Sequence, residues 1–268
     1  MISPARVAAY EILLDVSRGS ADLPSAIATA RQRLDDDRDR SLAAEIAAGV
    51  QRWRAALDYR ITAFAHRDAD RLDPEVLEIL RLSSYQLLHL TRVPAAAVVD
   101  DGVNLTKRAG KKSASGFVNA VLRSISRKRH ALPLPPRPSD PENRHASLEY
   151  LSISLSHPRW LATRWYDRFG FDIAERWMRF DNSPAPLTLR VNTLKTERAA
   201  LVAELHAEGV RVRPAVFAPD ALIVEDGQPL RGRAFNHGAC LVQDEASQLV
   251  AGFADARPGN RVLDACRL

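Results

Sequence analysis

The sequence has few features that could cross-link it or anchor it in a membrane. Its 268 residues include only two cysteines, Cys240 and Cys266, which are too few for a disulfide framework and indicate a reducing cytoplasm. No apolar run is long enough to span a membrane, and the N-terminus lacks the apolar core of a signal peptide. We therefore expect a cytoplasmic monomer with no membrane partner and no metal site.

Acidic residues are also missing from one long stretch. Residues 102–139 contain no Asp or Glu, whereas nine cations lie among them: Lys107, Arg108, Lys111, Lys112, Arg123, Arg127, Lys128, Arg129 and Arg137. An uncompensated basic run repels itself unless a polyanion relieves it, and both lysine and arginine pair with phosphate. The candidate RNA-binding residues here are Lys107, Arg108, Lys111, Lys112, Arg123, Arg127 and Lys128. The alternative is a solvated helix face, which charged runs usually form.

What the sequence does contain favours several packed domains. A hydrophobic content of 46% suffices for packed cores, and the length leaves room for two domains and part of a third. The net charge of +5 favours a polyanionic partner modestly, because charges of both signs are interspersed over much of the chain. We expect a helical bundle, then a small α+β domain, then the first elements of an α/β domain.

Residues 1–129 show helical periodicity. Between residues 38 and 65 the apolar positions keep one spacing through several turns, which predicts one long helix as the spine of the domain. Asp73-Pro74-Glu75 predicts the start of another helix, with a cap, a proline and an acid at the positive end of the dipole. A last helix is expected near 113–128. Brief connections between short helices favour an orthogonal bundle.

A proline-rich segment, 130–144, predicts an extended linker before a mixed unit at 145–234. Helices are expected after His157-Pro158 and, from the spacing of Ile173, Trp177 and Phe180, before Asn182-Ser183-Pro184. Strands at 187–192, 210–212 and 221–224 with a helix between the first two suggest an RRM-like platform. On it, Arg190 is a candidate for RNA contact, and a surface salt bridge is equally plausible. For His157, a capping or packing role is favoured over a catalytic one.

The stretch 235–268 has the pattern of a nucleotide-binding α/β domain. It predicts a short strand at 239–243, a helix at 244–254, a turn at Pro258-Gly259 and a buried strand at 261–266. An apolar strand that ends in Asp264 is what a doubly wound sheet presents before a ligand-binding loop. Without neighbouring parallel strands, 261–266 would have no ladder to complete, so we expect the residues after Phe253 to be poorly anchored.

Two sets of motifs carry family resemblances. Tyr-Gln-Leu-Leu at 85–88, Arg-Val-Pro at 92–94 and Gly-Phe-Val-Asn-Ala-Val-Leu-Arg at 116–123 resemble the NusB-type antitermination fold. Such modules bind RNA, alone as transcription factors or as an N-terminal extension of a methyltransferase family. Asn119 in this motif could face RNA, although a helix-anchoring hydrogen bond in the bundle is favoured.

The second set lies after the linker. His-Pro-x-Trp at 157–160, Leu-Arg-x-Asn at 189–192, Val-Gln-Asp-Glu-Ala-Ser-Gln at 242–248 and Val-Leu-Asp-Ala-Cys at 262–266 resemble the 16S ribosomal RNA cytosine-C5 methyltransferases of the Sun/RsmB type. The resemblance implies S-adenosylmethionine as cofactor and small-subunit ribosomal RNA as partner. In that family a glycine-rich cofactor loop follows the cysteine, whereas Arg267-Leu268 depart from it. The sequence therefore looks truncated or frameshifted at this motif.

The family reaction needs a thiolate that adds to C6 of an unstacked cytosine so that C5 can attack the methyl sulfonium. In the family the catalytic cysteines come later, so no catalytic residue is assigned here. Cys266 is at most a vestigial cofactor contact, with Asp264 near it, and Cys240 is most simply a small buried hydrophobe. We expect no bound cofactor in this chain.

Two functions follow. The first is the N-terminal part of an S-adenosylmethionine-dependent RNA methyltransferase that binds RNA and is inactive alone. The second is an autonomous RNA-binding or antitermination protein. Salt-sensitive RNA binding that survives loss of everything after Arg144 favours the second function.

Overall fold

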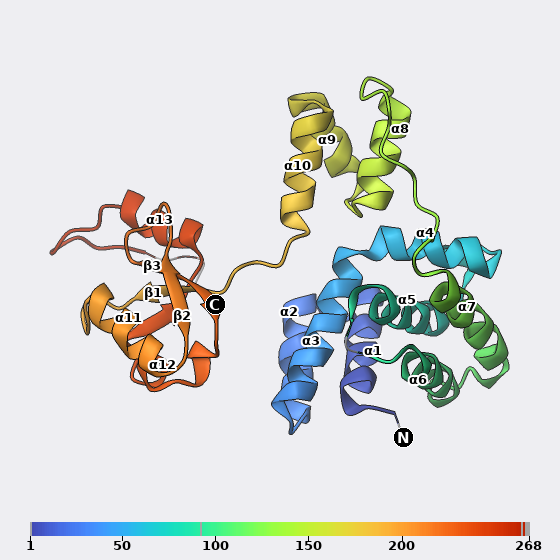
Figure 1. The fold of residues 1–268 in the computed structure, drawn as a ribbon, viewed down its shortest axis with the longest axis horizontal. Helices are drawn as coiled ribbons and strands as arrows, with labels where there is room; N and C mark the ends of the chain where they lie inside the picture. Colours follow the sequence, from blue (N-terminus) through green and yellow to red (C-terminus); the bar gives the residue numbers. More distant parts are fainter. Residues whose placement is uncertain (1, 92, 264, 266–268) are drawn as a thin grey trace. The chain divides into compact units, whose positions relative to one another are not determined.

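The computed structural model describes residues 2–91, 93–263 and 265 (Figure 1). The chain forms two compact units, Met1–Ser183 and Pro184–Leu268. Among the described residues, no helix is both long and apolar enough to cross a membrane.

Unit 1 begins with a helical bundle, as expected. Its elements are α1 (Pro4–Ser17), α2 (Leu23–Arg33), α3 (Asp37–Arg52), α4 (Arg54–Ala65), the 3₁₀ turn η1 (Ala69–Arg71), α5 (Pro74–His89), α6 (Ala95–Arg108), the 3₁₀ turn η2 (Lys112–Ala114) and α7 (Ser115–Lys128). The central helix is α5, in which every residue from Val76 to Leu87 is buried. It packs against α1, α3, α4, α6 and α7 (Figure 1). A helix that is buried all round belongs at the centre of a bundle.

The expected spine at 38–65 is wrong in one respect, because it is two helices. The helix α3 ends at Arg52, and α4 begins at Arg54 after Trp53, whose φ and ψ of −104° and 18° are not helical. The apolar spacing continues across Trp53 because both helices bury their apolar residues in the same core. Periodicity therefore gave the buried positions correctly and missed the break.

Unit 1 continues beyond the expected end of the first domain. Residues 132–138 have no regular structure, in agreement with the predicted linker. After them come α8 (Arg144–Glu149), the π-helix η3 (Tyr150–Ser154), α9 (Arg159–Phe169) and α10 (Phe171–Asp181). The π-helix packs on α4, and the backbone N–H of Ala55 donates a hydrogen bond of 3.0 Å to Ser156 Oγ. With these contacts, residues up to Ser183 form one compact unit with the bundle.

The helix suggested by Ile173, Trp177 and Phe180 is confirmed as α10, and its apolar residues divide between a buried and an exposed side. Phe171, Ala174 and Met178 are buried, whereas Trp177 and Phe180 are 48% and 73% exposed. Ile173 is exposed as well. Both faces of this amphipathic helix carry apolar residues, so periodicity could not decide which of them packs inward.

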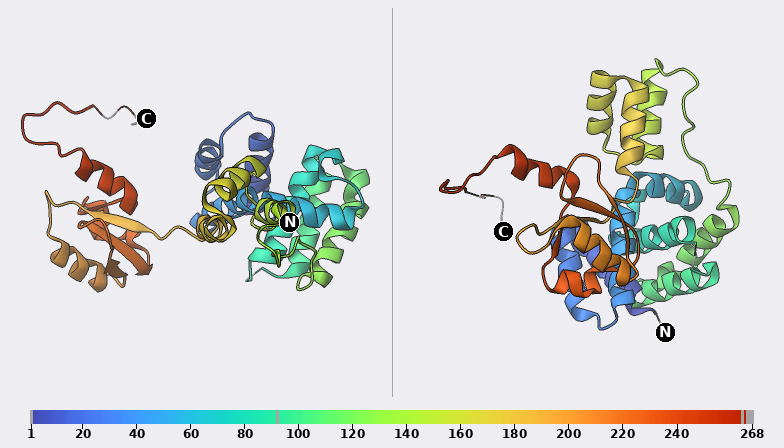
Figure 2. Two further views of the ribbon diagram at one scale, coloured as in Figure 1. Left: turned by 90° about the horizontal axis from the view of Figure 1, so that it is seen from above. Right: turned by 60° about the vertical axis from the view of Figure 1, so that its left-hand side comes forward.

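Unit 2 is built on an antiparallel sheet. Its elements are β1 (Thr188–Val191), α11 (Arg198–Ala207), β2 (Arg211–Pro214), β3 (Ala221–Asp226), the 3₁₀ turn η4 (Pro229–Arg231), α12 (Arg233–Asn236), β4 (Cys240–Val242) and α13 (Glu245–Phe253). The strand order is β2-β3-β1-β4. Residues from α11 and α12 pack with Leu189, Val191 and Leu222 in one apolar core. Figure 2 shows the ribbon from two further directions. This order and layering are those of a ferredoxin-like fold, in agreement with the RRM-like platform.

The strand at 240–242 belongs to this sheet, so it is not the first strand of a Rossmann-like domain, as the assignment of 235–268 had it. Val191 pairs with Cys240 and Leu189 with Val242 in an antiparallel ladder. The helix at 244–254 is confirmed as α13, capped by Asp244, whose side chain accepts from the Ser247 N–H. Residues 254–263 are exposed without helix or strand. The described part of the predicted strand 261–266 is therefore not a strand, and Asp264 and Cys266 lie outside the described residues.

Candidate RNA-binding surface

The cations between α6 and α7 have partners that the sequence does not reveal. Lys111 Nζ lies 2.9 Å from Asp73 Oδ2 and 3.5 Å from Glu75 Oε2, at the start of α5. The hydrogen bond to Asp73 raises the pKa of Lys111. Arg108 Nη2 lies 4.0 Å from Glu11 Oε1 on α1. A segment without acids in the sequence is thus partly neutralised by acids from other helices.

Lys107 and Lys112 remain free of such compensation. Both side chains are exposed, and neither has an ion pair or hydrogen bond with any described residue. Lys107 lies in the last turn of α6 and Lys112 in η2, so a few residues of chain separate them. We call these two residues the lysine pair. Exposed, unpaired ammonium groups can contact phosphates without first breaking a protein contact.

A second group of cations, Arg123, Arg127 and Lys128, lies toward the C-terminal end of α7. Arg123 Nε donates to Asn119 Oδ1 at 2.9 Å, and Arg127 Nη2 donates to Ser124 Oγ at 3.4 Å. Lys128 Nζ lies 5.5 Å from the centroid of the Phe64 ring. Within the described ranges none of the three has an acidic partner. We call them the α7 group.

The helix-anchoring hydrogen bond favoured for Asn119 from sequence is absent from the described contacts. Its side chain accepts from Arg123 one turn later on α7, so it orients a surface guanidinium and does not anchor one helix of the bundle to another. Opposite Arg123 and Arg127 a hollow of about 360 Å³ is lined by Val99 and Asp100 of α6. Arg123 is thus held in place at the edge of a depression.

The lysine pair and the α7 group are separate surfaces. A helix rises about 1.5 Å per residue, so the 14 residues of α7 extend over roughly 20 Å. Of these residues, Lys107, Arg127 and Lys128 lie in the last turns of their helices, where cations are also favoured by the helix dipole. The arrangement can hold phosphates at two places along one strand, and it offers no group for bond making.

Arg190 lies on β1 and pairs with Ala221 and Leu241 across the sheet. Its Nη1 donates to Gln243 Oε1 at 3.1 Å, and it makes no ion pair with a described residue. The salt bridge considered from sequence is therefore absent from the described contacts. The strands contain no aromatic residue, so the base-stacking mode typical of RRM sheets is not available on them.

His157 has a packing role, as favoured from sequence. Its Nδ1 lies 2.7 Å from the Leu155 carbonyl oxygen, and its ring lies against Trp165 with centroids 6.2 Å apart. Asn182 Nδ2 donates to the same carbonyl at 2.7 Å. The ring therefore joins the end of η3 to α9 and α10.

Cys240 is confirmed as a small buried residue. It is 1% exposed in the core of unit 2, and burial raises the pKa of its thiol. A thiol in this state is a poor nucleophile. The described residues also contain no parallel sheet with a glycine-rich loop at its edge, so they do not fit an S-adenosylmethionine site.

The two folds and their basic surfaces define the class of this chain as a helical RNA-binding module followed by a ferredoxin-like domain. Residues 3–127 match the NusB family, and residues 157–231 match the ferredoxin-like domain of RsmF/B-like methyltransferases. The chain therefore carries a NusB domain and an RsmF/B-like ferredoxin-like domain, as its motifs indicated. The second match begins at residue 157, which lies within unit 1, and therefore includes α9 and α10.

Similar proteins have consistent names. The chain is 36% identical over 230 residues to the "Probable ribosomal RNA small subunit methyltransferase B" of Bacillus subtilis, which covers 86% of this chain and 49% of the relative. It is 33% identical to the "Ribosomal RNA small subunit methyltransferase B" of Pseudomonas putida, over 97% of this chain and 57% of the relative. The chain thus spans about half the length of these curated relatives.

A solved structure, described as that of PH0851, has the same fold over most of the chain. It superposes with a TM-score of 0.65 at 21% identity and covers 97% of this chain and 57% of that chain. This similarity supports the order of helical and ferredoxin-like domains described above.

Proposed function

We propose that this chain supplies the RNA-binding part of an S-adenosylmethionine-dependent enzyme that methylates C5 of a cytosine in small-subunit ribosomal RNA. The observation that carries this proposal is the combination in one chain of a NusB domain and an RsmF/B-like ferredoxin-like domain. A NusB domain alone would support RNA binding only. The names of relatives that align with most of the chain support small-subunit ribosomal RNA as the substrate.

The residues described here serve RNA binding and not bond making. Methyl transfer to C5 needs a reactive thiolate beside an unstacked base. Cys240 is enclosed by Leu189, Val191 and the helices of unit 2, which excludes it from contact with a base. We expect the 268-residue chain to bind RNA and to transfer no methyl group by itself.

Mass spectrometry of ribosomal RNA from cells that lack the gene tests the proposal. We expect one 5-methylcytosine to disappear from the small-subunit RNA and to return when the gene is restored. Unchanged cytosine methylation would contradict the proposed reaction. Labelled methyl transfer from S-adenosylmethionine to RNA by the purified 268-residue chain would contradict its inactivity.

A second candidate is an autonomous RNA-binding or antitermination protein. It is favoured by one observation, that six of the eight candidate cations lie within residues 3–127, the others being Lys128 and Arg190. This function predicts that RNA affinity is unchanged when the chain ends at Ser183, the boundary of unit 1. It also predicts that deletion of the gene leaves ribosomal RNA methylation intact.

A further inference from the structure

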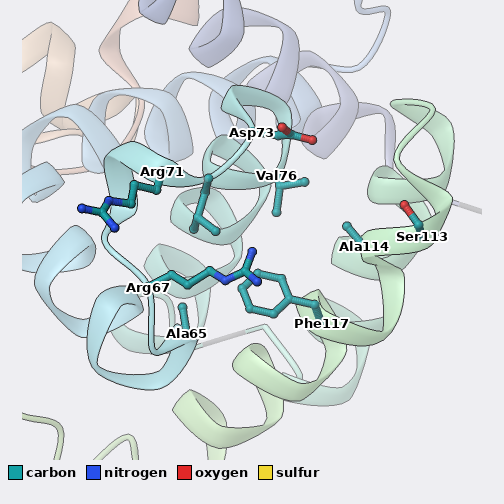
Figure 3. A pocket seen from close by; sticks show the side chains of 9 residues that line it. Ala65, Arg67, Arg71, Asp73, Val76, Ser113, Ala114 and Phe117 are labelled. Atoms are coloured by element: carbon teal, nitrogen blue, oxygen red, sulfur yellow. The ribbon is translucent and has the colours of Figure 1, made fainter.

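A pocket of about 490 Å³ lies in unit 1 between the connection from α4 to α5 and the start of α7. Its floor is apolar and includes Ala65 and Val76, which are buried, and Leu72, Ala114 and Phe117, which are partly buried. Polar groups surround the opening: Arg67, Arg71, Asp73 and Ser113. Figure 3 shows Arg67 directed from the α4–α5 connection toward the Phe117 side of the pocket. The pocket thus combines an apolar, partly aromatic interior with a cationic opening.

The charged side chains at this opening differ in whether they have an ion-pair partner. Asp73, the only carboxylate among the lining residues, forms an ion pair of 2.9 Å with Lys111. Arg71 Nε lies 3.5 Å from Asp68 Oδ2, in a pair whose side chains are 77% and 63% exposed. Such an exposed pair contributes little and is readily exchanged for another anion. Arg67 makes no ion pair or hydrogen bond with any residue that the structure describes, so the opening has an excess of positive charge.

The backbone at the pocket is also unusual. His66, immediately before Arg67, has a φ of 52° and ends α4 in the left-handed conformation. That conformation is uncommon for a residue other than glycine. It ends the helix so that the chain turns into the segment that bears Arg67 and Arg71. The two guanidinium groups are thus presented by a defined turn.

The chemistry of the pocket fits one class of ligand. An apolar interior accepts a flat ring, an aromatic side chain can stack on it, and guanidinium groups at the entrance pair with phosphate. The volume lies within the range of pockets that hold small molecules. Lys112 of the lysine pair is adjacent in sequence to Ser113 of the lining, so a strand bound there reaches this opening.

We propose that this pocket receives one unpaired nucleotide of the bound RNA, with its base against Phe117 and its phosphate at Arg67 and Arg71. The proposal rests on the RNA-binding function proposed above and names the form of RNA that the site takes. Bases in a duplex are stacked and cannot enter, so the pocket selects single-stranded loops or ends. Unlike the lysine pair, it distinguishes unpaired from paired RNA.

The test compares two RNAs of equal length, a hairpin with an unpaired loop and a fully paired duplex, by fluorescence anisotropy. The variants are the double substitution Arg67→Gln/Arg71→Gln and the single substitution Phe117→Leu, which keeps the apolar floor and removes the ring. The matched control is Arg31→Gln/Arg33→Gln, two exposed arginines at the end of α2 in the same unit. Circular dichroism melting verifies that each variant is folded.

We expect both pocket variants to lower affinity for the looped RNA about tenfold, in line with the loss of one stacked base or its phosphate contacts. Affinity for the duplex should change less than about twofold, and the control should weaken both RNAs equally or not at all. Equal weakening of loop and duplex by the pocket variants, or no weakening of either, overturns the proposed pocket while RNA binding itself stands.

Two further outcomes test whether the pocket takes a nucleotide of RNA or a free nucleotide. If the wild-type chain binds neither RNA at low salt, the proposed function fails and the pocket proposal fails with it. Adenosine 5′-monophosphate is the second probe. One outcome is that the wild-type chain binds this nucleotide tightly while the pocket variants do not bind it and still bind the looped RNA normally. In that case the pocket takes free nucleotides, and its assignment to RNA is overturned.

Discussion

Gly49 is a residue for which the core leaves no room. It lies in α3 against the ring of Tyr85 from α5, and a Cβ at this position would overlap that ring. Tyr85 cannot easily move, because it is 4% exposed and its hydroxyl donates to Glu45 Oε1 at 2.7 Å. The glycine permits the close approach of two helices that carry much of the core.

Gly49→Ala should therefore destabilise unit 1, by about 1–3 kcal/mol from overpacking. Gly116→Ala is the matched control, since Gly116 is also helical and has no atom within 4 Å of the added Cβ. The control should be neutral or stabilising by up to about 1 kcal/mol, because alanine is the better helix former. Urea denaturation of the two variants measures both changes. A Gly49→Ala chain as stable as the wild type would show that α3 and α5 are not packed as described.

His89 makes the bundle sensitive to acid. Its ring stacks between Trp53 and Tyr85, with centroids 5.2 and 5.0 Å apart, and its Nε2 is buried without a partner in the described structure. Burial, together with the nearby Arg60, lowers its pKa to about 4. The unfolded chain binds this proton near pH 6.5 and the folded chain does not, so stability falls as pH decreases from about 6.5 to about 4.

His89→Phe keeps a flat ring in the stack and removes the titration. We expect the wild type to lose on the order of 1–2 kcal/mol more than this variant between pH 7 and pH 4.5. Chemical denaturation at the two pH values gives the difference, and carboxylates shared by both proteins cancel from it. Equal losses in the two proteins would mean that His89 titrates normally.

Among the elements, β4 shows how local pattern and long-range pairing differ. Its three residues predict a short strand in either an antiparallel or a parallel sheet. Only the ladder with β1 decides between them, with Val191 opposite Cys240 and Leu189 opposite Val242. The sequence thus gives the existence of the strand, and the partner comes from contacts some 50 residues away.

Removing residues 235–268 should therefore damage the sheet of unit 2. Leu189 and Val191 would lose their neighbour on one side, and the amides of β1 should lose at least about tenfold of their protection against hydrogen exchange. A chain that ends at Ala254 is the control, because it keeps β4 and α13, and the described residues beyond Ala254 are exposed and without helix or strand. If the amides of β1 keep their full protection in the chain that lacks residues 235–268, the result would support the domain boundary expected near residue 235.

The same distinction explains what else could be predicted. Helix positions and most core residues of the bundle follow from 3.6-residue spacing, and the ferredoxin-like order follows from one strand, one helix and two strands. The break at Trp53 and the exposed Trp177 could not be predicted, because spacing does not reveal a local change of φ and ψ or choose between two apolar faces. The ion pairs of Lys111 with Asp73 and Glu75 could not be predicted either, because these residues are far apart in the sequence and meet only in the folded bundle.

At the scale of the whole chain, the proposed function separates RNA binding from methyl transfer. The cations of unit 1 and Arg190 of unit 2 suit phosphate contact, whereas the described thiol is buried. The Sun/RsmB domain pair connects these binding surfaces to a methyltransferase family whose curated members are about twice as long as this chain. The chain is thus interpreted as the part that selects and holds the RNA.

The salt dependence of RNA affinity of the 268-residue chain tests this account most directly. A small-subunit ribosomal RNA fragment should bind, and each phosphate contact should contribute about 0.7–0.9 to the slope of log K against log salt. Neutralising the lysine pair, by Lys107→Gln/Lys112→Gln, should lower that slope by roughly 1.4–1.8, while Arg31→Gln/Arg33→Gln should leave it unchanged. No RNA binding at low salt, or the same slope in all three proteins, would contradict the central claim that this chain holds RNA through these residues.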